Sequence, residues 1–322
     1  MKNHQHLPNN IIMLLRNEKP VTSNTVISKD ISTITDVRES LYDIFRYLKT
    51  MDMLIRVYPY QETEPDVVAT LLGVESLGLN TLTNAIKNGF MILRNFFLKL
   101  RDATVAFFKY LFDANARIRG NLAKRMSDYS RSGTALTAEN SPTVALVAYS
   151  AFSSTYVMLE KLFVETQAVY KAHSKDAIAA NCSALKTFGY DIQDYRVVNT
   201  DSIIEFPKLT KQFLSSDADW GWSIQALTEA SNKVLILSSK AEKLNYIREK
   251  INNSVKSATY AIDRLNMIGN ADAAIKVQTE LNEVAIVSGY LFNCATVFQK
   301  KIDYLAAQFI ETWTVLNTIN TR

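Results

Sequence analysis

The feature that most constrains the fold is a long stretch without proline, residues 77–131. Apolar residues recur in it mostly three or four positions apart, which is the period of one helix face. They are Leu79, Leu82, Ile86, Phe90, Leu93, Phe97, Leu100, Phe107 and Leu111. The stretch therefore predicts one long amphipathic helix, whose apolar side the rest of the chain has to cover.

The same stretch is strongly basic. Residues 76–131 contain ten Lys or Arg and three Asp or Glu, a balance of +7. Nine of these basic residues are candidates for contact with an anionic partner: Lys87, Arg94, Lys99, Arg101, Lys109, Arg117, Arg119, Lys124 and Arg125. The charge predicts that such a partner is nucleic acid or acidic lipid.

Aromatic residues make the apolar side of this helix unusually wide. Phe96 and Phe97 are adjacent, as are Phe107 and Phe108, and Phe112 follows Leu111 directly. Neighbouring residues of a helix point about 100° apart, so such pairs cover more than one contact stripe. Either two neighbouring helices cover this sector, or one side of it meets a partner or a membrane.

The remaining chain predicts three more helices of similar length. They are expected at residues 142–187, 223–267 and 271–317, the first starting at Ser141 as N-cap with Pro142 in the first helical position. The glycine-asparagine turn at residues 269–270 makes the last two antiparallel neighbours. We therefore expect an all-α protein, an elongated bundle of about four long antiparallel helices. The scarcity of glycine (9) and proline (6) agrees with this expectation.

The charge divides the chain into two parts. Residues 1–75 carry eight basic and ten acidic residues, a balance of −2, whereas residues 76–322 carry +6. The first part is expected to be an acidic N-terminal extension or propeptide with one helix at residues 36–58. The second is the helical bundle. Within it, residues 189–221 contain β-branched patches and a proline, which predicts a long connection with a short helix or a small hairpin.

The sequence offers little catalytic chemistry. The three histidines are His4 and His6, near the N-terminus, and His173, which is expected late in a helix as a solvated surface residue. No glycine-rich phosphate loop or CxxC motif occurs, and Cys182 and Cys294 are expected to be buried free thiols. We expect no enzymatic activity, no cofactor and no metal site. No export signal is visible, and no transmembrane span is expected, because Arg94 and Lys99 interrupt the apolar candidate at residues 90–100.

A possible processing site precedes the basic helix. Residues 72–76 read Leu-Gly-Val-Glu-Ser, which matches a pattern of Leu or Ile, two free positions, Glu and a small residue. This pattern is similar to the cleavage signal of prohead maturation proteases in large tailed phages. The residues concerned are Leu72, Glu75 and Ser76, and the resemblance places the cut after Glu75. The layout of an acidic extension, this site and a basic amphipathic helix resembles the internal head or core proteins of those phages.

The resemblance implies a non-enzymatic virion structural protein, made in the host cytoplasm and located inside the capsid. Its implied partners are packaged DNA, contacted nonspecifically through phosphates, other head proteins and the prohead protease. Two alternatives stay open. One is an α-helical pore-forming or membrane-acting protein, for which the wide aromatic sector speaks. The other is a self-assembling helical scaffold, a homo-oligomer held by the aromatic face.

Overall fold

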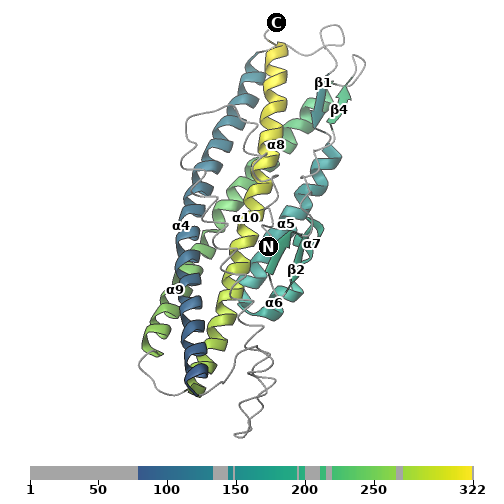
Figure 1. Cartoon of the computed structure of the whole chain (residues 1–322). Helices are drawn as coiled ribbons and strands as arrows, with labels where there is room; N and C mark the ends of the chain where they lie inside the picture. The colour runs from purple at the N-terminus through teal and green to yellow at the C-terminus, as the bar shows by residue number, and fades with distance from the viewer. Residues whose placement is uncertain are drawn as a thin grey trace, which may run out of the picture.

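The computed structural model describes residues 79–132, 144–147, 149–193, 196–199, 211–214, 220–265 and 271–320. The expected N-terminal extension, with its helix at residues 36–58, lies outside the described residues, so its boundary at residue 75 stays a prediction. Within the described ranges the protein is a helical bundle with two short β-ribbons (Figure 1). The all-α class is confirmed at this coarse level.

Two helices run the length of the bundle (Figure 1). Helix α4 is Leu79–Arg131 with 53 residues, and α10 is Ala271–Asn320 with 50 residues. At about 1.5 Å per residue, each is about 75–80 Å long. The helices predicted at residues 77–131 and 271–317 are thus confirmed, and α10 lies at the centre with α4, α5, α8 and α9 around it.

The two long helices run in the same direction. The ring of Phe107 lies 5.6 Å from that of Phe292, and the ring of Tyr129 lies 5.3 Å from that of Trp313. The second contact lies closer to the C-terminal end of both helices than the first, so α4 and α10 are parallel. The expectation that all long helices alternate in direction is therefore wrong for α4 and α10.

Helices α8 (Trp220–Lys243) and α9 (Asn245–Leu265) run against α4. Arg119 pairs with Glu242, and Arg94, further towards the start of α4, pairs with Asp263. Because α10 runs parallel to α4, α9 and α10 run in opposite directions, as the sequence predicted for the last two helices.

Helix α5 (Tyr149–Ala172) lies on the far side of α10 and runs against it. Phe152 packs on Phe309 with ring centroids 5.1 Å apart, and Phe163 packs on Phe298 at 5.9 Å. Helices α5 and α8 consequently run in the same direction, which demands a long return connection between them.

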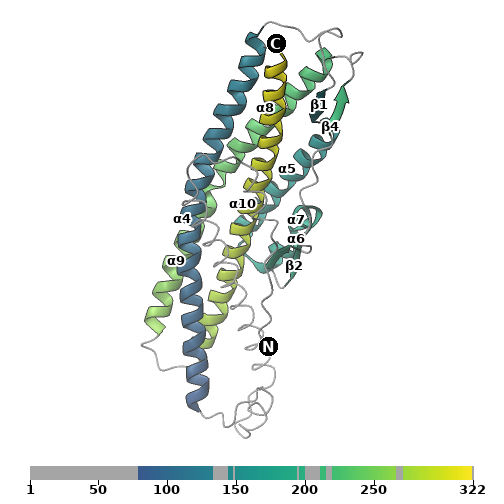
Figure 2. The ribbon, with the colours of Figure 1, turned by 45° about the horizontal axis from the view of Figure 1, so that its top comes forward.

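Two β-ribbons lie along this return connection, near opposite ends of α5 (Figure 2). Strands β2 (Tyr190–Gln193) and β3 (Arg196–Asn199) form the small hairpin that the sequence offered as one of two choices. Strand β4 (Lys211–Leu214) pairs antiparallel with β1 (Val144–Val147) beside the start of α5. The connection thus returns the chain to the end of the bundle where α8 begins.

The prediction of one continuous helix over residues 142–187 is wrong. It becomes strand β1, helix α5, and two short helices, α6 (Lys175–Ala180) and α7 (Ser183–Thr187). The break after α5 comes at His173, whose φ is 49°, and the Ser174 side chain then caps α6 by accepting from the Ala177 N–H at 3.2 Å. Val144–Val147 thus pair as a strand with β4, and the predicted helix start at Ser141 and Pro142 lies outside the described residues.

The start of α7 is capped from within the core. Glu165 of α5 is 8% exposed and accepts hydrogen bonds from the Ser183 hydroxyl at 2.5 Å and the Ala184 N–H at 2.9 Å. A buried carboxylate at a helix start is stabilised by free N–H groups. This contact holds the α6–α7 segment against α5.

The helix predicted at residues 223–267 is interrupted once, at Leu244. The Leu244 N–H bonds to the Ala241 carbonyl at 3.0 Å, and the Ile247 N–H bonds to the Leu244 carbonyl at 2.8 Å. These three-residue hydrogen bonds tighten the helix locally. Leu244 is 1% exposed, so packing of its side chain into the core accompanies the interruption.

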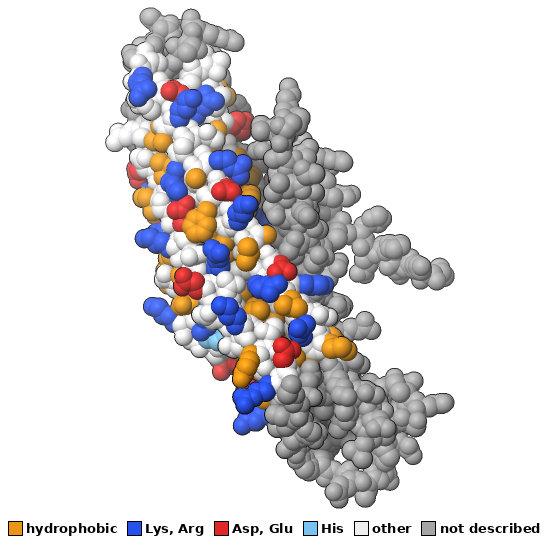
Figure 3. Space-filling view, turned by 90° about the vertical axis from the view of Figure 1, so that its left-hand side faces the viewer, with side chains coloured by type: hydrophobic (Ala, Val, Ile, Leu, Met, Phe, Trp, Pro, Cys, Tyr) orange, Lys and Arg blue, Asp and Glu red, His pale blue; other side chains and the backbone are white. Residues whose placement is uncertain are grey.

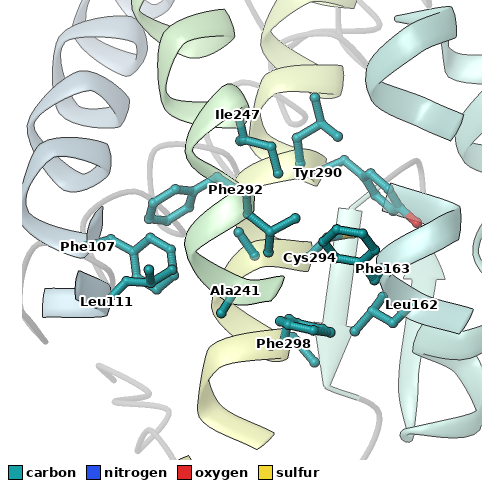
Figure 4. Packing of buried hydrophobic residues seen from close by; sticks show 14 of the residues in the cluster. Phe107, Leu111, Leu162, Phe163, Ala241, Ile247, Tyr290, Phe292, Cys294 and Phe298 are labelled. Carbon is teal, nitrogen blue, oxygen red and sulfur yellow. The ribbon is translucent and has the colours of Figure 1, made fainter. Parts of the chain in front are cut away.

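The core fills the space on both sides of α10 (Figure 4). Phe107 and Leu111 of α4 point towards Phe292, while Leu162 and Phe163 of α5 lie on the opposite side of α10. Because residues on nearly all sides of α10 are buried, this helix is the axis around which the other helices pack.

A polar network lies within the apolar contact of α4 and α10. Asn115 donates to the Gln299 side-chain oxygen at 2.9 Å, and Gln299 donates to Asn115 at 3.2 Å and to Asp303 at 2.8 Å. The Tyr110 hydroxyl donates to the second Asp303 oxygen at 2.7 Å. Because buried amides are costly without partners, the network favours one register of the parallel pair.

One cation is buried among the residues that the structure describes. Lys301 is 5% exposed, its amine sits 4.8 Å from the Phe188 ring centroid, and burial lowers its pKa from 10.5 to about 8. Because the unfolded chain then binds more protons above pH ~8, stability rises with pH until ~10.5. We expect the free energy of unfolding to increase by about 2 kcal/mol between pH ~7 and ~9.5.

This rise is measured by urea unfolding at a series of pH values. Lys301→Met should flatten the profile, whereas Lys300→Met, at an exposed neighbouring position, should leave it unchanged. A rise that persists in Lys301→Met would assign it to another group.

Candidate functional site

The basic residues of α4 divide into paired and unpaired groups. Arg94 pairs with Asp263 at 3.4 Å, Arg101 with its neighbour Asp102 at 2.9 Å, and Arg119 with Glu242 at 2.7 Å. Two of these three pairs tie α4 to α9 and α8. Arg94 and Arg119 thus stabilise the packing of α4 in the bundle. Their ion pairs reduce the positive charge that α4 can present to an anionic partner.

The second group has no carboxylate partner among the described residues. Lys99, Lys109 and Lys124 are exposed, and Arg125 is half-buried. The Arg117 side chain is exposed and donates to the Asp113 carbonyl at 3.3 Å. Of these five cations, Arg117 lies near enough to Asp303 of α10 to lower the pKa of that carboxyl, while Lys99, Lys109, Lys124 and Arg125 form no ion pair with a described acid.

Most of the uncovered cations share one side of α4. At 3.6 residues per turn, Lys99, Lys109, Arg117, Lys124 and Arg131 fall within a sector of about 80°. We call these five residues the basic row, and it extends about 48 Å along the helix. Arg131 was not among the candidates from the sequence, although it is the last residue of α4 and is exposed.

Acidic residues accompany the row. Asp102, Asp113 and Asp128 are the three acids of α4, and Asp263 and Glu242 neutralise Arg94 and Arg119 from neighbouring helices. The +7 balance of the helix is thus reduced to about +5 in its surroundings. The side formed by α4 and α9 shows blue side chains along its length with fewer red ones and scattered orange ones (Figure 3).

Lys87 lies in α4, but its side chain is outside the described residues. The processing residues Leu72, Glu75 and Ser76 also lie outside them, so the proposed cut stays a prediction.

The aromatic sector of α4 is mostly core. Phe96, Phe97 and Phe108 are 0% exposed and Phe107 is 5% exposed, because α10 covers one side of the sector and α8 with α9 the other. Of the two explanations left open by the sequence, two covering neighbours account for most of its width. Phe112, at 36% exposure, remains at the surface.

The most apolar helix is α10, and not the segment at residues 90–100. Within the described residues, α10 is the one helix long and apolar enough to cross a membrane, over Lys276–Ile319. Of its most apolar window, 83% is buried inside the bundle, as in the core helix of a water-soluble protein. The sequence prediction named residues 90–100, and not α10, as the most apolar candidate.

His173 is placed differently from the sequence expectation. It ends α5 and is half-buried, and its Nδ1 lies buried without a hydrogen-bond partner. Burial lowers its pKa, as does Lys250, while Glu283 opposes the shift. Histidines 4 and 6 lie outside the described residues, among which no group of three His, Cys, Asp or Glu side chains could hold a metal.

The two cysteines are buried and free, as predicted. Burial raises the pKa of Cys294 to about 12, so its thiol stays protonated near neutral pH. A thiol in that state is a poor nucleophile.

Comparison of the chain with family models, curated proteins and solved structures finds no match.

Proposed function

We propose that this chain is a non-enzymatic virion structural protein of a large tailed phage, located inside the head and in contact with packaged DNA. The observation that carries the proposal is the basic row of α4, of which Lys99, Lys109 and Lys124 have no carboxylate partner among the described residues. A row of about 48 Å matches the extended, regularly charged backbone of DNA, where phosphates follow about every 1.7 Å of the duplex axis.

The structure favours nucleic acid over a membrane as the anionic partner. A membrane-acting helix needs a continuous apolar side that can leave the protein. In α4 that side is buried against α10, α8 and α9, with Phe96, Phe97 and Phe108 fully covered. The cations, in contrast, are accessible without any rearrangement of the bundle.

Glu75 adds the phage context to this proposal. The cut after Glu75 would release the acidic extension, whose balance is −2, from the basic remainder at +6. Removal of acidic residues beside a DNA-contacting helix strengthens its attraction to phosphate. Processing would thus couple head maturation to DNA contact.

Salt-dependent binding to a random-sequence DNA duplex tests the DNA contact. We expect log K to fall linearly with log salt, with a slope of about −3 to −5 for three to five phosphate contacts. Binding that is absent at low salt, or a slope near zero, would contradict the proposal.

N-terminal sequencing of the protein from mature particles tests the processing step separately. We expect the chain to begin at Ser76. A start at Met1 or Lys2 would remove the cleavage from the proposal while leaving the DNA contact untouched.

A further inference from the structure

Helix α9 exposes an aromatic ring beside α4. Tyr260 is 65% exposed, which is the largest exposed fraction among the bulky apolar side chains that the structure describes. Aromatic side chains usually contribute to a core or to an interface, because each can remove about 150–250 Å² of surface from water. The ring of Tyr260 instead faces solvent, so its apolar surface is available to a ligand.

Two cations of α9 flank this ring. Lys256 lies one turn before Tyr260 and Arg264 one turn after it, on the same side of the helix, and both are exposed. Neither cation forms an ion pair with a described acid. The guanidinium carbon of Arg264 lies 5.8 Å from the centroid of the Tyr260 ring, within the range of a cation–π contact. Because an aromatic ring has two faces, a cation over one of them leaves the other open.

Helix α4 adds two more cations next to the ring. Arg94 pairs at 3.4 Å with Asp263, which follows Tyr260 by three residues. Arg101 follows Arg94 by seven residues, or about two turns, so it lies on the same side of α4. Because α9 runs against α4, Arg101 is level with Lys256, which precedes Asp263 by the same seven residues. The ring therefore lies between two levels of positive charge.

The ring and its four neighbouring cations form what we call the α9 platform: Tyr260, Lys256, Arg264, Arg94 and Arg101. Asp263 and Asp102 pair with the two arginines of α4, so four cations and two acids leave a balance of +2. This charge favours an anionic ligand, and the open face of the ring favours a ligand that carries flat rings. Unpaired nucleotides combine both properties, because each has a phosphate and a base.

We propose that the α9 platform binds single-stranded DNA, with an unpaired base stacked on Tyr260 and the neighbouring phosphates on the cations beside it. In a duplex the bases stack on one another, so their faces are not available to a side chain. An exposed ring therefore strengthens binding only where a base is unpaired. It does so without selecting a sequence, because every base has a face that can stack.

This inference rests on the proposed DNA contact and deepens it, because it names the form of DNA that the chain prefers. The basic row lies farther round α4, with its centre about 100° from Arg94. Its cations attract the phosphates of a duplex and of a single strand alike. The α9 platform, in contrast, distinguishes the two forms, because only the single strand offers a base to Tyr260.

Binding of the full chain to a short oligo(dT) and to a random duplex of the same length tests the stacking, with fluorescence anisotropy as the measurement. We expect Tyr260→Ala to weaken oligo(dT) binding about 5- to 150-fold, as for loss of one stacked base, and duplex binding less than about twofold. The salt slope of oligo(dT) binding should stay unchanged, because the substitution removes no charge. Tyr260→Trp should retain the affinity, since the indole ring also stacks on bases.

Two further variants serve as controls. Val164 is 61% exposed on α5, on the far side of α10, so Val164→Ala should leave both affinities unchanged. The double variant Lys256→Gln, Arg264→Gln should reduce the salt slope of oligo(dT) binding by about 1.4, which separates phosphate contacts from stacking. Thermal unfolding of Tyr260→Ala should match that of the wild-type chain, because the ring is exposed.

The outcomes separate this inference from the proposed function. If Tyr260→Ala weakens oligo(dT) and duplex binding equally, or weakens neither, the inference is overturned while the DNA contact itself stands. A wild-type chain that binds neither form of DNA contradicts the proposed function as well. Vesicles with and without acidic lipid supply the other arm: binding to acidic vesicles that requires Tyr260, in a chain that does not bind oligo(dT), assigns the platform to a lipid surface and overturns the inference.

Discussion

Replacement of Trp313 by alanine should lower the free energy of unfolding by about 3–5 kcal/mol. The side chain is 1% exposed and is among the largest fully buried residues of the described bundle. Its indole N–H donates to the Ser231 hydroxyl of α8 at 2.8 Å, and its ring packs edge-on against Tyr129 of α4. One side chain thus joins three helices, and its loss leaves both a cavity and an unpaired hydroxyl acceptor.

Val315→Ala is the matched control on the same helix. Val315 is 44% exposed, so its truncation should change stability by about 0.5 kcal/mol or less. Urea unfolding followed by far-ultraviolet circular dichroism measures both variants without using tryptophan fluorescence. Equal effects of the two substitutions would show that this end of α10 is not packed between α4 and α8.

The long helices could be predicted because their signal is local. Within residues 77–131 and 271–317 the helical period continues without proline, and each stretch forms one helix. Interruptions depend on weaker signals. The break at His173 could have been recognised from Ser174, an N-cap residue followed by Asp176 in the first turn of α6. At Leu244 neither glycine nor proline marks the interruption, so tertiary packing accounts for it.

The helix directions could not be predicted because they depend on contacts between distant residues. A short turn fixes the relation of α9 to α10, but nothing local fixes that of α4 to α10. The register of that pair is expressed by Asn115 with Gln299, which are 184 residues apart. In the sequence, each of these two residues is indistinguishable from a solvent-exposed polar residue of a helix. Only the fold shows that they are buried hydrogen-bond partners.

In the candidate site, too, the locally determined features could be predicted and those that depend on distant residues could not. The sequence identified every basic residue of α4 that could meet an anion except Arg131. It could not show that Arg94 and Arg119 are paired, because Asp263 and Glu242 lie more than a hundred residues away. It also could not decide how much of the aromatic sector is core, since that depends on α8, α9 and α10 covering α4 together.

Neutralising the basic row should weaken DNA binding far more than the same charge change elsewhere. We expect the triple variant Lys99→Gln, Lys109→Gln, Lys124→Gln to bind a random duplex about 10²–10³-fold more weakly at low salt, with a salt slope smaller by about 2.7. All three lysines are exposed and have no carboxylate partner among the described residues, so the substitutions should leave the bundle stable. Fluorescence anisotropy at several salt concentrations measures both quantities.

The control variant is Lys161→Gln, Lys171→Gln, Lys186→Gln, which removes the same charge from exposed positions of α5 and α7. These helices pack on the other side of α10 and α8 from α4. If DNA lies along the basic row, this control should retain most of the affinity and nearly the full salt slope, because few phosphates come within a Debye length of it. If both variants lose affinity equally, attraction depends on net charge alone, and α4 has no special place in the contact. The difference between the two variants therefore measures how far the row itself, and not the overall charge of the chain, positions DNA on this protein.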